Sequence, residues 1–492
     1  MRSLAKAPWA QIALLLIFYV IVWTLYATWT QRNLDGFGDM LENYSWGIAW
    51  QNGYFKHPPL FAWITAAWFS VLPRADWAYY LLSAVNSAVM FFFSWRIAVR
   101  FLDPWRAVLS TALFFFLPPV TFLAIKYNAN AAMLPFWAGT ALFYLRFLEK
   151  RRLVDAVILG ALAAGAVLIK YYSAALLGAI CLHVLLDRQA RPLLASLGVW
   201  LASATFLILI APHVYWLFQN DFRPLTYAAE QGDGSALAGV VSAPRFLGAL
   251  LAYLLPVLLV LLIAILRNGR GAWFETRRFA ALRTSLVGRA LLWTNFGALA
   301  LTLLLGVAFA VEFSSVWALP LYFAAPILLL LFVRPGRLEE QRLAIPAAVV
   351  IYGAALLALS PIIRSEEAED MSHYNAVPVR SIATQIEKAW NERFDAPFVY
   401  VAGDKILASG TTFYAASRPY SMQESSFQLT PWITEADVRA RGIAIACFAD
   451  QAWCIGRAEK FPVGAVAEEE FTVPGFNGER DWQVRLFLVP PA

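Results

Sequence analysis

Apolar runs of membrane-spanning length recur along this chain, and they limit its fold more than any other feature. Eleven such runs lie at 9–29, 77–99, 106–124, 131–148, 153–170, 172–187, 193–212, 245–267, 288–310, 314–334 and 343–361. A transmembrane helix needs roughly 20 mostly apolar residues. Mean hydropathy is +0.59, and only 15% of the residues are charged, against about 25% in typical soluble domains. The sequence therefore predicts an α-helical polytopic membrane protein with about 11 transmembrane helices.

Short cationic loops between these runs predict the orientation. They contain Arg96, Arg100 and Arg106, then Arg146 and 150–152, then Arg188 and Arg191, and then six arginines between 267 and 289. If eleven helices cross, all these loops fall on the side of the N-terminus, which the positive-inside rule makes cytoplasmic. No A-x-A-like cleavage site follows the first run, so we expect it to remain as a span. Topology accounts for the net charge of +6, and no nucleic-acid partner is expected.

The residues after about 364 have the pattern of a soluble domain. Short apolar runs, FVYVAG, GIAIACFA and VRLFLVP, alternate with glycine, proline and charged residues, which is typical of a small α/β domain. We therefore predict two domains, a membrane domain over 1–363 and a soluble domain over 364–492 on the outer side. Cys447 and Cys454 lie close together in the second of these. They either form a disulfide in an oxidising compartment or remain two unpaired residues.

Residues 58–73, PPLFAWITAAWFSVLP, are apolar but form a run of only 16 residues with proline at both ends. Counting this run as a span would move every later cationic loop to the side opposite the N-terminus. We therefore expect a helix along the outer membrane interface, with Pro58 and Pro59 at its start. Lys56 and His57 precede it directly, where a helix N-terminus already favours an anion. This arrangement predicts a binding site for a phosphate at the lipid headgroup level.

The same outer loop carries the acids Asp35, Asp39 and Glu42. The i, i+3 spacing of Asp39 and Glu42 would place both on one helix face. Beside a phosphate-binding cation, Asp39 is suited to take a proton from an acceptor hydroxyl or amine, while Lys56 and His57 stabilise charge on a leaving phosphate. The alternative is that Asp39 only caps the helix that follows it.

Metal and nucleotide signatures are sparse in this sequence. It has no Walker motif, no dinucleotide-binding fingerprint and no HExxH. Its four histidines, at 57, 183, 213 and 373, are scattered, so no metal centre is predicted. The carboxylates of Asp39 and Glu42 are suited to bind a divalent cation, and a divalent cation is therefore the one cofactor that the sequence leaves open.

The stretch GDMLENYSWGIAWQNGYFKHPPLFAW, residues 38–63, resembles the first outer loop of the GT-C glycosyltransferases. The resemblance is to the bacterial branch similar to protein O-mannosyltransferases and the lipid A aminoarabinose transferase. It implies that Asp39 stands at the family's first acid and His57 at the residue before the prolines. Met40 occupies a place where the family often has glutamate, and Glu42 is the residue that could replace it.

Four later stretches are similar to segments of the same family. They are KYNANAAMLPFW, GAVLIKYYSAALL, APHVYWLFQNDFRPLTYA and VWALPLYFAAPILLL. Asn130 in the first stands where the family often has aspartate. The cations Lys126 and Lys170 are further candidates for the donor phosphate, with snorkelling as the alternative for Lys170. His213, Asp221 and Arg223 are candidates for sugar or acceptor contacts, and the alternative is a loop folded over the helices.

The resemblance implies a GT-C fold and an inverting transfer on the outer face of a bacterial inner membrane. The implied partners are a polyprenyl-phosphate-linked sugar donor, membrane lipids, and an acceptor that is lipid A or its core, another glycan, or a protein. A transporter or flippase for a lipid-linked or anionic substrate is the alternative. Transporters carry their polar residues near the bilayer midplane, whereas the polar residues here gather in the predicted outer loops.

Overall fold

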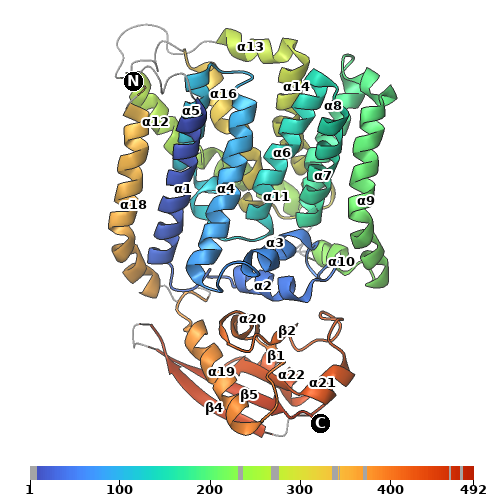
Figure 1. Cartoon of the computed structure of the whole chain (residues 1–492), viewed down its shortest axis with the longest axis vertical. Coiled ribbons are helices and arrows are strands. Elements are labelled where there is room, and N and C mark those ends of the chain that lie inside the picture. Colours follow the sequence, from blue (N-terminus) through green and yellow to red (C-terminus); the bar gives the residue numbers. More distant parts are fainter. Residues whose placement is uncertain are drawn as a thin grey trace. The chain divides into compact units, whose positions relative to one another are not determined.

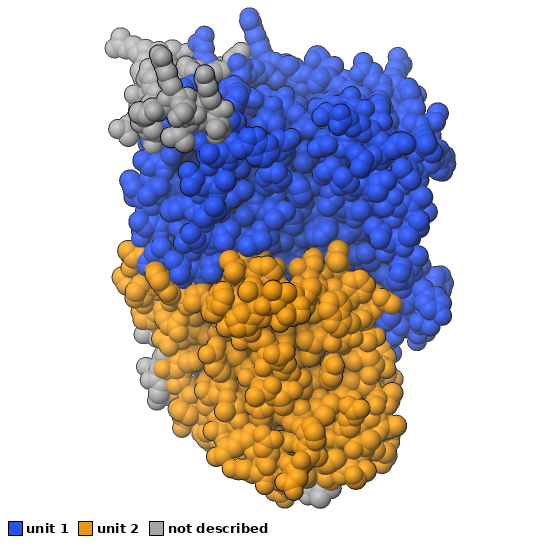
Figure 2. Space-filling view, viewed as in Figure 1, with its two compact units in different colours: residues 1–25, 56–58, 83–357 blue, residues 26–55, 59–82, 358–492 orange. Residues whose placement is uncertain are grey.

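The computed structural model describes residues 8–230, 237–266, 276–334, 342, 344–369, 374–464, 467–476 and 480–492. The chain divides into two compact units, coloured separately in Figure 2. The first unit comprises residues 1–25, 56–58 and 83–357, and the second comprises 26–55, 59–82 and 358–492. The second unit thus joins most of the predicted first outer loop, residues 30–76, to the C-terminal part of the chain. The predicted domain boundary between 363 and 364 falls inside one continuous helix and stays a prediction.

The long helices of the first unit lie roughly parallel to one another (Figure 1). The helices up to residue 230 are α1 (Pro8–Thr30), α2 (Asp39–Ala49), α3 (Leu60–Phe69), α4 (Asp76–Ala98), α5 (Pro104–Ala112), α6 (Ala129–Lys150), α7 (Leu153–Ile169), α8 (Ala174–Leu186), α9 (Leu197–Gln219) and α10 (Arg223–Glu230). They are followed by α11 (Ala238–Ala252), α12 (Leu255–Leu266), α13 (Thr276–Thr284), α14 (Leu286–Leu292), α15 (Ala298–Ala308), α16 (Ala325–Phe332) and α18 (Ala344–Glu369). The short helical turns include η2 (Leu113–Phe116), η5 (Tyr171–Ser173), the π-helical η7 (Trp293–Gly297) and η8 (Ser315–Ala324).

All eleven predicted apolar runs coincide with helical segments. Within the described residues, eight helices are long and apolar enough to cross a membrane, or up to nine if the bent segment 104–124 is one span. That segment bends by 85°, where Pro118 and Pro119 remove backbone donors. The segments 153–169 and 171–186 are shorter apolar helices. The number of spans therefore stays a prediction, while the multi-pass membrane character is clear.

Burial separates the central helices from those at the periphery. The apolar window of α6 is 83% buried, whereas that of α9 is only 11% buried. Large apolar side chains on α9, such as Trp200, Leu207 and Ile208, are mostly exposed. An exposed apolar face of this size is expected to be covered by lipid or by a partner. The ten residues of α3 are too few to cross a bilayer core of about 30 Å at 1.5 Å per residue, as expected for residues 58–73.

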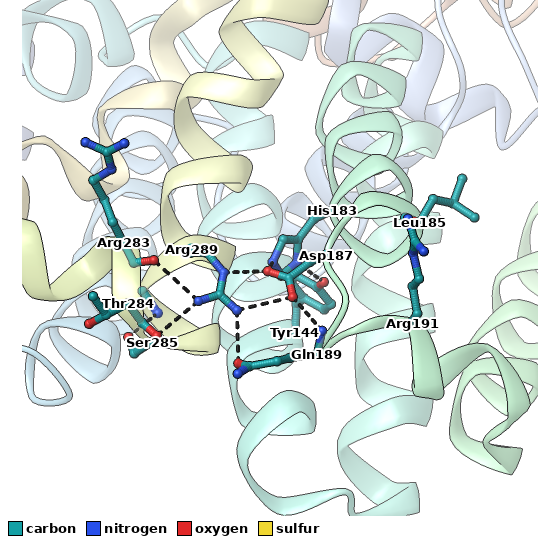
Figure 3. A network of polar contacts seen from close by, with 11 residues as sticks. Tyr144, His183, Leu185, Asp187, Gln189, Arg191, Arg283, Thr284, Ser285 and Arg289 are labelled. Atoms are coloured by element: carbon teal, nitrogen blue, oxygen red, sulfur yellow. Dashed lines mark hydrogen bonds and ion pairs between the residues drawn. The ribbon is translucent and has the colours of Figure 1, made fainter.

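A polar network ties two of the predicted cationic loops together (Figure 3). Arg289 Nε donates to Asp187 Oδ2 at 2.5 Å, and Arg289 Nη2 donates to Asp187 Oδ1 at 3.2 Å. Buried His183 lies between this carboxylate, 3.4 Å from its Nε2, and the Tyr144 hydroxyl, 2.6 Å from its Nδ1. The hydrogen bonds from Arg289 lower the pKa of Asp187 to about 2. This bidentate pair fixes the end of α8 to the start of α14; residues 267–275 of the same cationic stretch lie outside the described part of the chain.

Replacing Arg289 by methionine should lower the free energy of unfolding by about 1–3 kcal/mol, because the Asp187 carboxylate would lose its charged partner. The measurement is a thermal denaturation of the purified protein in detergent. Arg277→Met is the matched control, since Arg277 is exposed on neighbouring α13. Equal melting temperatures for the two variants would show that the network does not stabilise the fold.

The C-terminal part of the second unit contains a five-stranded mixed sheet. Its strands are β1 (Tyr400–Gly403), β2 (Tyr420–Gln423), β3 (Ile443–Phe448), β4 (Ala467–Pro474) and β5 (Asp481–Val489), and its helices are α19 (Val379–Arg393), α20 (Lys405–Tyr414), α21 (Glu435–Arg441) and α22 (Ala452–Glu459). The strand order is β2-β1-β3-β5-β4. β1 pairs in parallel with β2 and β3, while β5 is antiparallel to β3 and β4. The small α/β domain predicted from the sequence is therefore confirmed.

One face of this sheet packs against α21 and α22. Its apolar core includes Ile443 and Ile445 of β3 with Val438 of α21 and Ile455 of α22. Cys447 of β3 and Cys454 of α22 form a disulfide in this core, which selects the first of the two alternatives that the sequence left open. The disulfide thus joins α22 to the central strand of the sheet.

The first outer loop packs against α20 within the second unit. Gly410 and Phe413 of α20 contact Leu41 and Tyr44 of α2. Arg74, between α3 and α4, donates to the carbonyl oxygens of Phe413 and Ala415 at 2.9 Å each. A cation at these last carbonyls favourably caps the C-terminal end of α20. The outer loop and the soluble part therefore fold as one body.

Candidate functional site

Asp39 is the first residue of α2, and the backbone of the turn before it requires a glycine. Gly38 adopts φ 73°, and a Cβ there would come within 2.8 Å of Ile406 Cδ1. The buried Asp35 carboxylate accepts hydrogen bonds from the backbone amides of Asp39, at 3.2 Å, and Met40, at 2.8 Å. Asp35 therefore caps α2, and the alternative that Asp39 does so is wrong.

The two acids predicted to share a face of α2 differ in exposure. The Asp39 side chain is 32% exposed, whereas Glu42, one turn later, is 4% exposed. The neighbouring Asn43 donates to Thr65 Oγ1 at 2.8 Å and to the Tyr79 hydroxyl at 3.1 Å, which fixes the face of α2 against α3 and α4. Of the two acids, Asp39 is the one that can meet a substrate from solution.

The soluble part of the second unit supplies a cation to this acid. Lys405, the first residue of α20, places its Nζ 3.8 Å from Asp39 Oδ1. The two residues are 366 positions apart in the chain. No sequence pattern indicates this pair, because a lysine in a soluble domain is an ordinary surface residue.

Lys170 lies at the break between two apolar helices of the first unit. It follows the last residue of α7 with an extended backbone and precedes the turn η5. Its Nζ donates to Asn130 Oδ1, at 2.5 Å, and lies 5.4 Å from the centroid of the Trp317 ring. The structure thus brings together the two predicted residues Lys170 and Asn130, and adds an aromatic side chain.

The two tyrosines after Lys170 connect this break to neighbouring helices. The Tyr172 hydroxyl is 3.0 Å from Thr302 Oγ1 of α15, and the Tyr172 ring stacks on Trp137 of α6. The Tyr171 hydroxyl is 2.8 Å from Nε2 of the buried His213 on α9. These contacts place His213 in the packing around Lys170, and the sequence did not indicate the two tyrosines as partners.

The remaining predicted residues also lie in the first unit. Lys56 Nζ is 5.9 Å from the centroid of the Tyr227 ring of α10, and the His57 and Lys126 side chains are half-buried. Asp221 is exposed, with a φ of 52° just before α10. Arg223, the first residue of α10, is half-buried. His373 lies outside the described residues, and within the described ones no three His, Cys, Asp or Glu side chains are arranged to hold a metal ion.

Three comparisons relate this chain to known proteins. Residues 56–216 match the family described as dolichyl-phosphate-mannose-protein mannosyltransferase. The chain is 25% identical over 375 residues, 72% of either chain, to the lipopolysaccharide core galacturonosyltransferase RgtB of Rhizobium johnstonii. It is 24% identical over 205 residues to the lipid A galacturonosyltransferase RgtD of the same organism, covering 41% of this chain and 43% of that one.

The fold of the whole chain is similar to that of a solved structure. The crystal structure of ArnT from Cupriavidus metallidurans bound to undecaprenyl phosphate aligns over 97% of each chain, with a TM-score of 0.53 and 16% sequence identity. At this identity the likeness concerns the fold. The alignment covers residues of both the helical unit and the small C-terminal sheet.

Proposed function

We propose that this chain is a membrane glycosyltransferase of the GT-C fold and that it transfers a sugar from a polyprenyl phosphate to a lipid A, core or other envelope acceptor. The observation that carries the proposal is the placement of Asp39. It is a partly exposed acid at the start of α2, in the loop whose sequence resembles the family's first outer loop. The backbone amides of Asp39 and Met40 donate to Asp35, so a carboxylate other than Asp39 accepts from the first amides of α2.

In the proposed reaction Asp39 is the general base. Its carboxylate takes the proton of an acceptor hydroxyl, or of an amine, as the acceptor atom bonds to the anomeric carbon of the donor sugar. The bond between that carbon and the phosphate oxygen breaks, and its electron pair leaves with the phosphate. The products are the glycosylated acceptor, with inverted anomeric configuration, and polyprenyl phosphate. Glu42 supports the site from the buried side of α2.

Cations of the first unit are proposed to bind the donor phosphate. Lys56 and His57 are the first candidates, and Lys170 and Lys126 follow. The contacts of Lys170 support its role, because Asn130 fixes its ammonium beside the Trp317 ring at a break in the helices. A cation held in this way stabilises the negative charge that develops on a leaving phosphate.

The names of the relatives suggest the sugar and acceptor to test first. Both are galacturonosyltransferases, one acting on lipopolysaccharide core and the other on lipid A. A uronic acid adds a carboxylate to the donor, and the half-buried guanidinium of Arg223 is chemically suited to bind it. Asn130, His213 and Asp221 are the further candidates for sugar or acceptor contacts.

The transfer is proposed to occur on the outer face of a bacterial inner membrane, with the N-terminus in the cytoplasm. Two observations support this orientation. The short cationic loops gather on one side if eleven helices cross, and the disulfide Cys447–Cys454 is typical of domains in oxidising compartments such as the periplasm.

A comparison of cells with and without this chain tests the proposed function. Lipid A and core oligosaccharide from the two strains would be compared by mass spectrometry. We expect one glycosyl increment to be absent without the chain and to return when the wild-type chain is expressed again. Identical envelope glycans in both strains would exclude these acceptors.

A further inference from the structure

We propose that Lys405, carried by the soluble C-terminal part of the chain, is a positioning residue for the Asp39 base and that this part thereby completes the catalytic centre. The inference rests on the proposed function, and it goes further because it gives the C-terminal part a role in the chemistry. The ammonium of Lys405 keeps the Asp39 carboxylate ionised and oriented toward the acceptor. The contact that carries the inference is the Nζ to Oδ1 distance of 3.8 Å.

The backbone before Lys405 places this residue with little freedom. β1 ends at Gly403, whose φ of 109° is a backbone conformation that only glycine adopts readily. A Cβ at this position would lie 2.0 Å from the Ala446 carbonyl oxygen. The amide of the next residue, Asp404, donates to the same oxygen at 2.9 Å. The Asp404 side chain then caps α20 by accepting from the Ile406 amide at 2.9 Å. Lys405 is therefore held in place at the start of α20, directly after the end of β1 in the parallel part of the sheet.

Helices α2 and α20 also hold each other in register. Gly38 contacts Ile406 at their N-terminal ends, and the rings of Tyr44 and Phe413 meet edge to face at 5.0 Å near their C-terminal ends. The two helices thus lie side by side in the same direction. Their first residues, Asp39 and Lys405, are brought together by this packing rather than by flexible side chains alone.

Helix stability does not explain a lysine at this position. The first turn of a helix favours an acidic residue, because the unpaired amides give it partial positive charge. A lysine as first residue of α20 opposes this preference. The pairing with Asp39 gives it a function that offsets the unfavourable position.

Acidic groups surround Asp39, so a nearby cation would stabilise its ionised carboxylate. Asp35 and Glu42 lie on its own segment, and Asp404 and the Tyr374 hydroxyl face the same region from the soluble part, since both interact electrostatically with Lys405. Burial raises the pKa of Asp404 and of Tyr374. Neighbouring acids disfavour a further negative charge, whereas a cation within about 4–6 Å favours it.

Carbodiimide labelling of Asp39 tests the contact without requiring transfer activity. This reagent couples an amine to protonated carboxyl groups, and peptide mass spectrometry reports the labelled fraction of Asp39 against pH. Both side chains are partly exposed, at 23% for Lys405 and 32% for Asp39, so the reagent can reach the site. In Lys405→Ala the labelling curve should move to higher pH, and in Lys405→Arg it should stay near that of the wild type. An unmoved curve in Lys405→Ala would overturn the proposal.

Kinetics then test the role in transfer. In Lys405→Ala the acidic limb of kcat/KM should shift to higher pH, with a loss of about 3- to 10-fold on that limb and recovery toward the wild-type rate at higher pH. Lys405→Arg should restore the profile, and Lys388→Ala, at an exposed lysine of α19, is the matched control. A loss that is equal at every pH would assign Lys405 a structural role and overturn the proposal.

The two hypotheses fail in different ways. If Asp39→Asn transfers sugar as well as the wild type, the proposed base is wrong whatever the labelling shows. If Asp39→Asn is inactive but Lys405→Ala has the wild-type pH profile, only the role of Lys405 is wrong. In the Asp39→Asn background, Lys405→Ala should cause no further loss on the acidic limb, because the titrating carboxylate is already absent.

Discussion

Replacing Asp39 by asparagine should lower the turnover of sugar transfer by about 10²- to 10⁴-fold, the range expected when a general base is removed. Asparagine keeps the size of the side chain but cannot accept the acceptor proton. The fold should be retained, because Asp35 rather than Asp39 caps α2. The measurement is the release of polyprenyl phosphate under saturating donor, together with a melting curve for each variant.

Asp395→Asn is the matched control for this variant, since Asp395 is an exposed acid of the same unit. It should leave both turnover and melting temperature unchanged. A reduction of less than threefold in Asp39→Asn would remove Asp39 from the mechanism. A large loss of melting temperature would instead show that the residue is needed for the fold.

Replacing Lys56 and His57 together by glutamine should weaken binding of the polyprenyl-phosphate donor by about 10- to 100-fold, because a hydrogen bond to a charged group contributes about 1.5–3 kcal/mol. Turnover should fall as well, since the same cations would stabilise the leaving phosphate. The measurement is a titration of donor, followed by single-turnover rates at saturation.

The double variant Lys150→Gln with Arg152→Gln removes two exposed cations from the same unit and serves as the control. Donor affinity should be unchanged in this control. Unchanged affinity in the Lys56 and His57 variant as well would move the phosphate site elsewhere. Lys170→Gln would then be the next variant, because Asn130 and Trp317 already hold that side chain.

The membrane helices were predictable because their signal is local. A span needs only a continuous apolar run, and each of the eleven predicted runs coincides with a helical segment. The central strands β1 and β3 and the second half of β5 were predictable for the same reason, because they are short, mostly buried apolar runs. The edge strands β2 and β4 were missed. β4 alternates exposed and half-buried residues and includes Glu468, Glu469 and Glu470, because an edge strand faces solvent and is kept polar.

The candidate site was less accessible to sequence reasoning, because its contacts join distant segments. Asp39 and Glu42 could be paired by helical spacing, but their difference in burial depends on α3, α4 and α20. The Lys170–Asn130 contact joins residues 40 positions apart and had only separate resemblances to suggest it. Lys405 had no signal at all, since its partner depends on α2 and α20 packing together.

Reconstitution of the purified protein with polyprenyl-phosphate sugars and envelope lipid would show directly whether the protein transfers a sugar. Mass spectrometry of the acceptor lipids would report whether a sugar has been transferred. Glycosyl transfer with Asp39 as its base predicts a new glycosyl increment in the wild type, an equal yield of polyprenyl phosphate, and neither product with Asp39→Asn. Movement of intact donor across the vesicle membrane without any increment would contradict it and would favour a flippase.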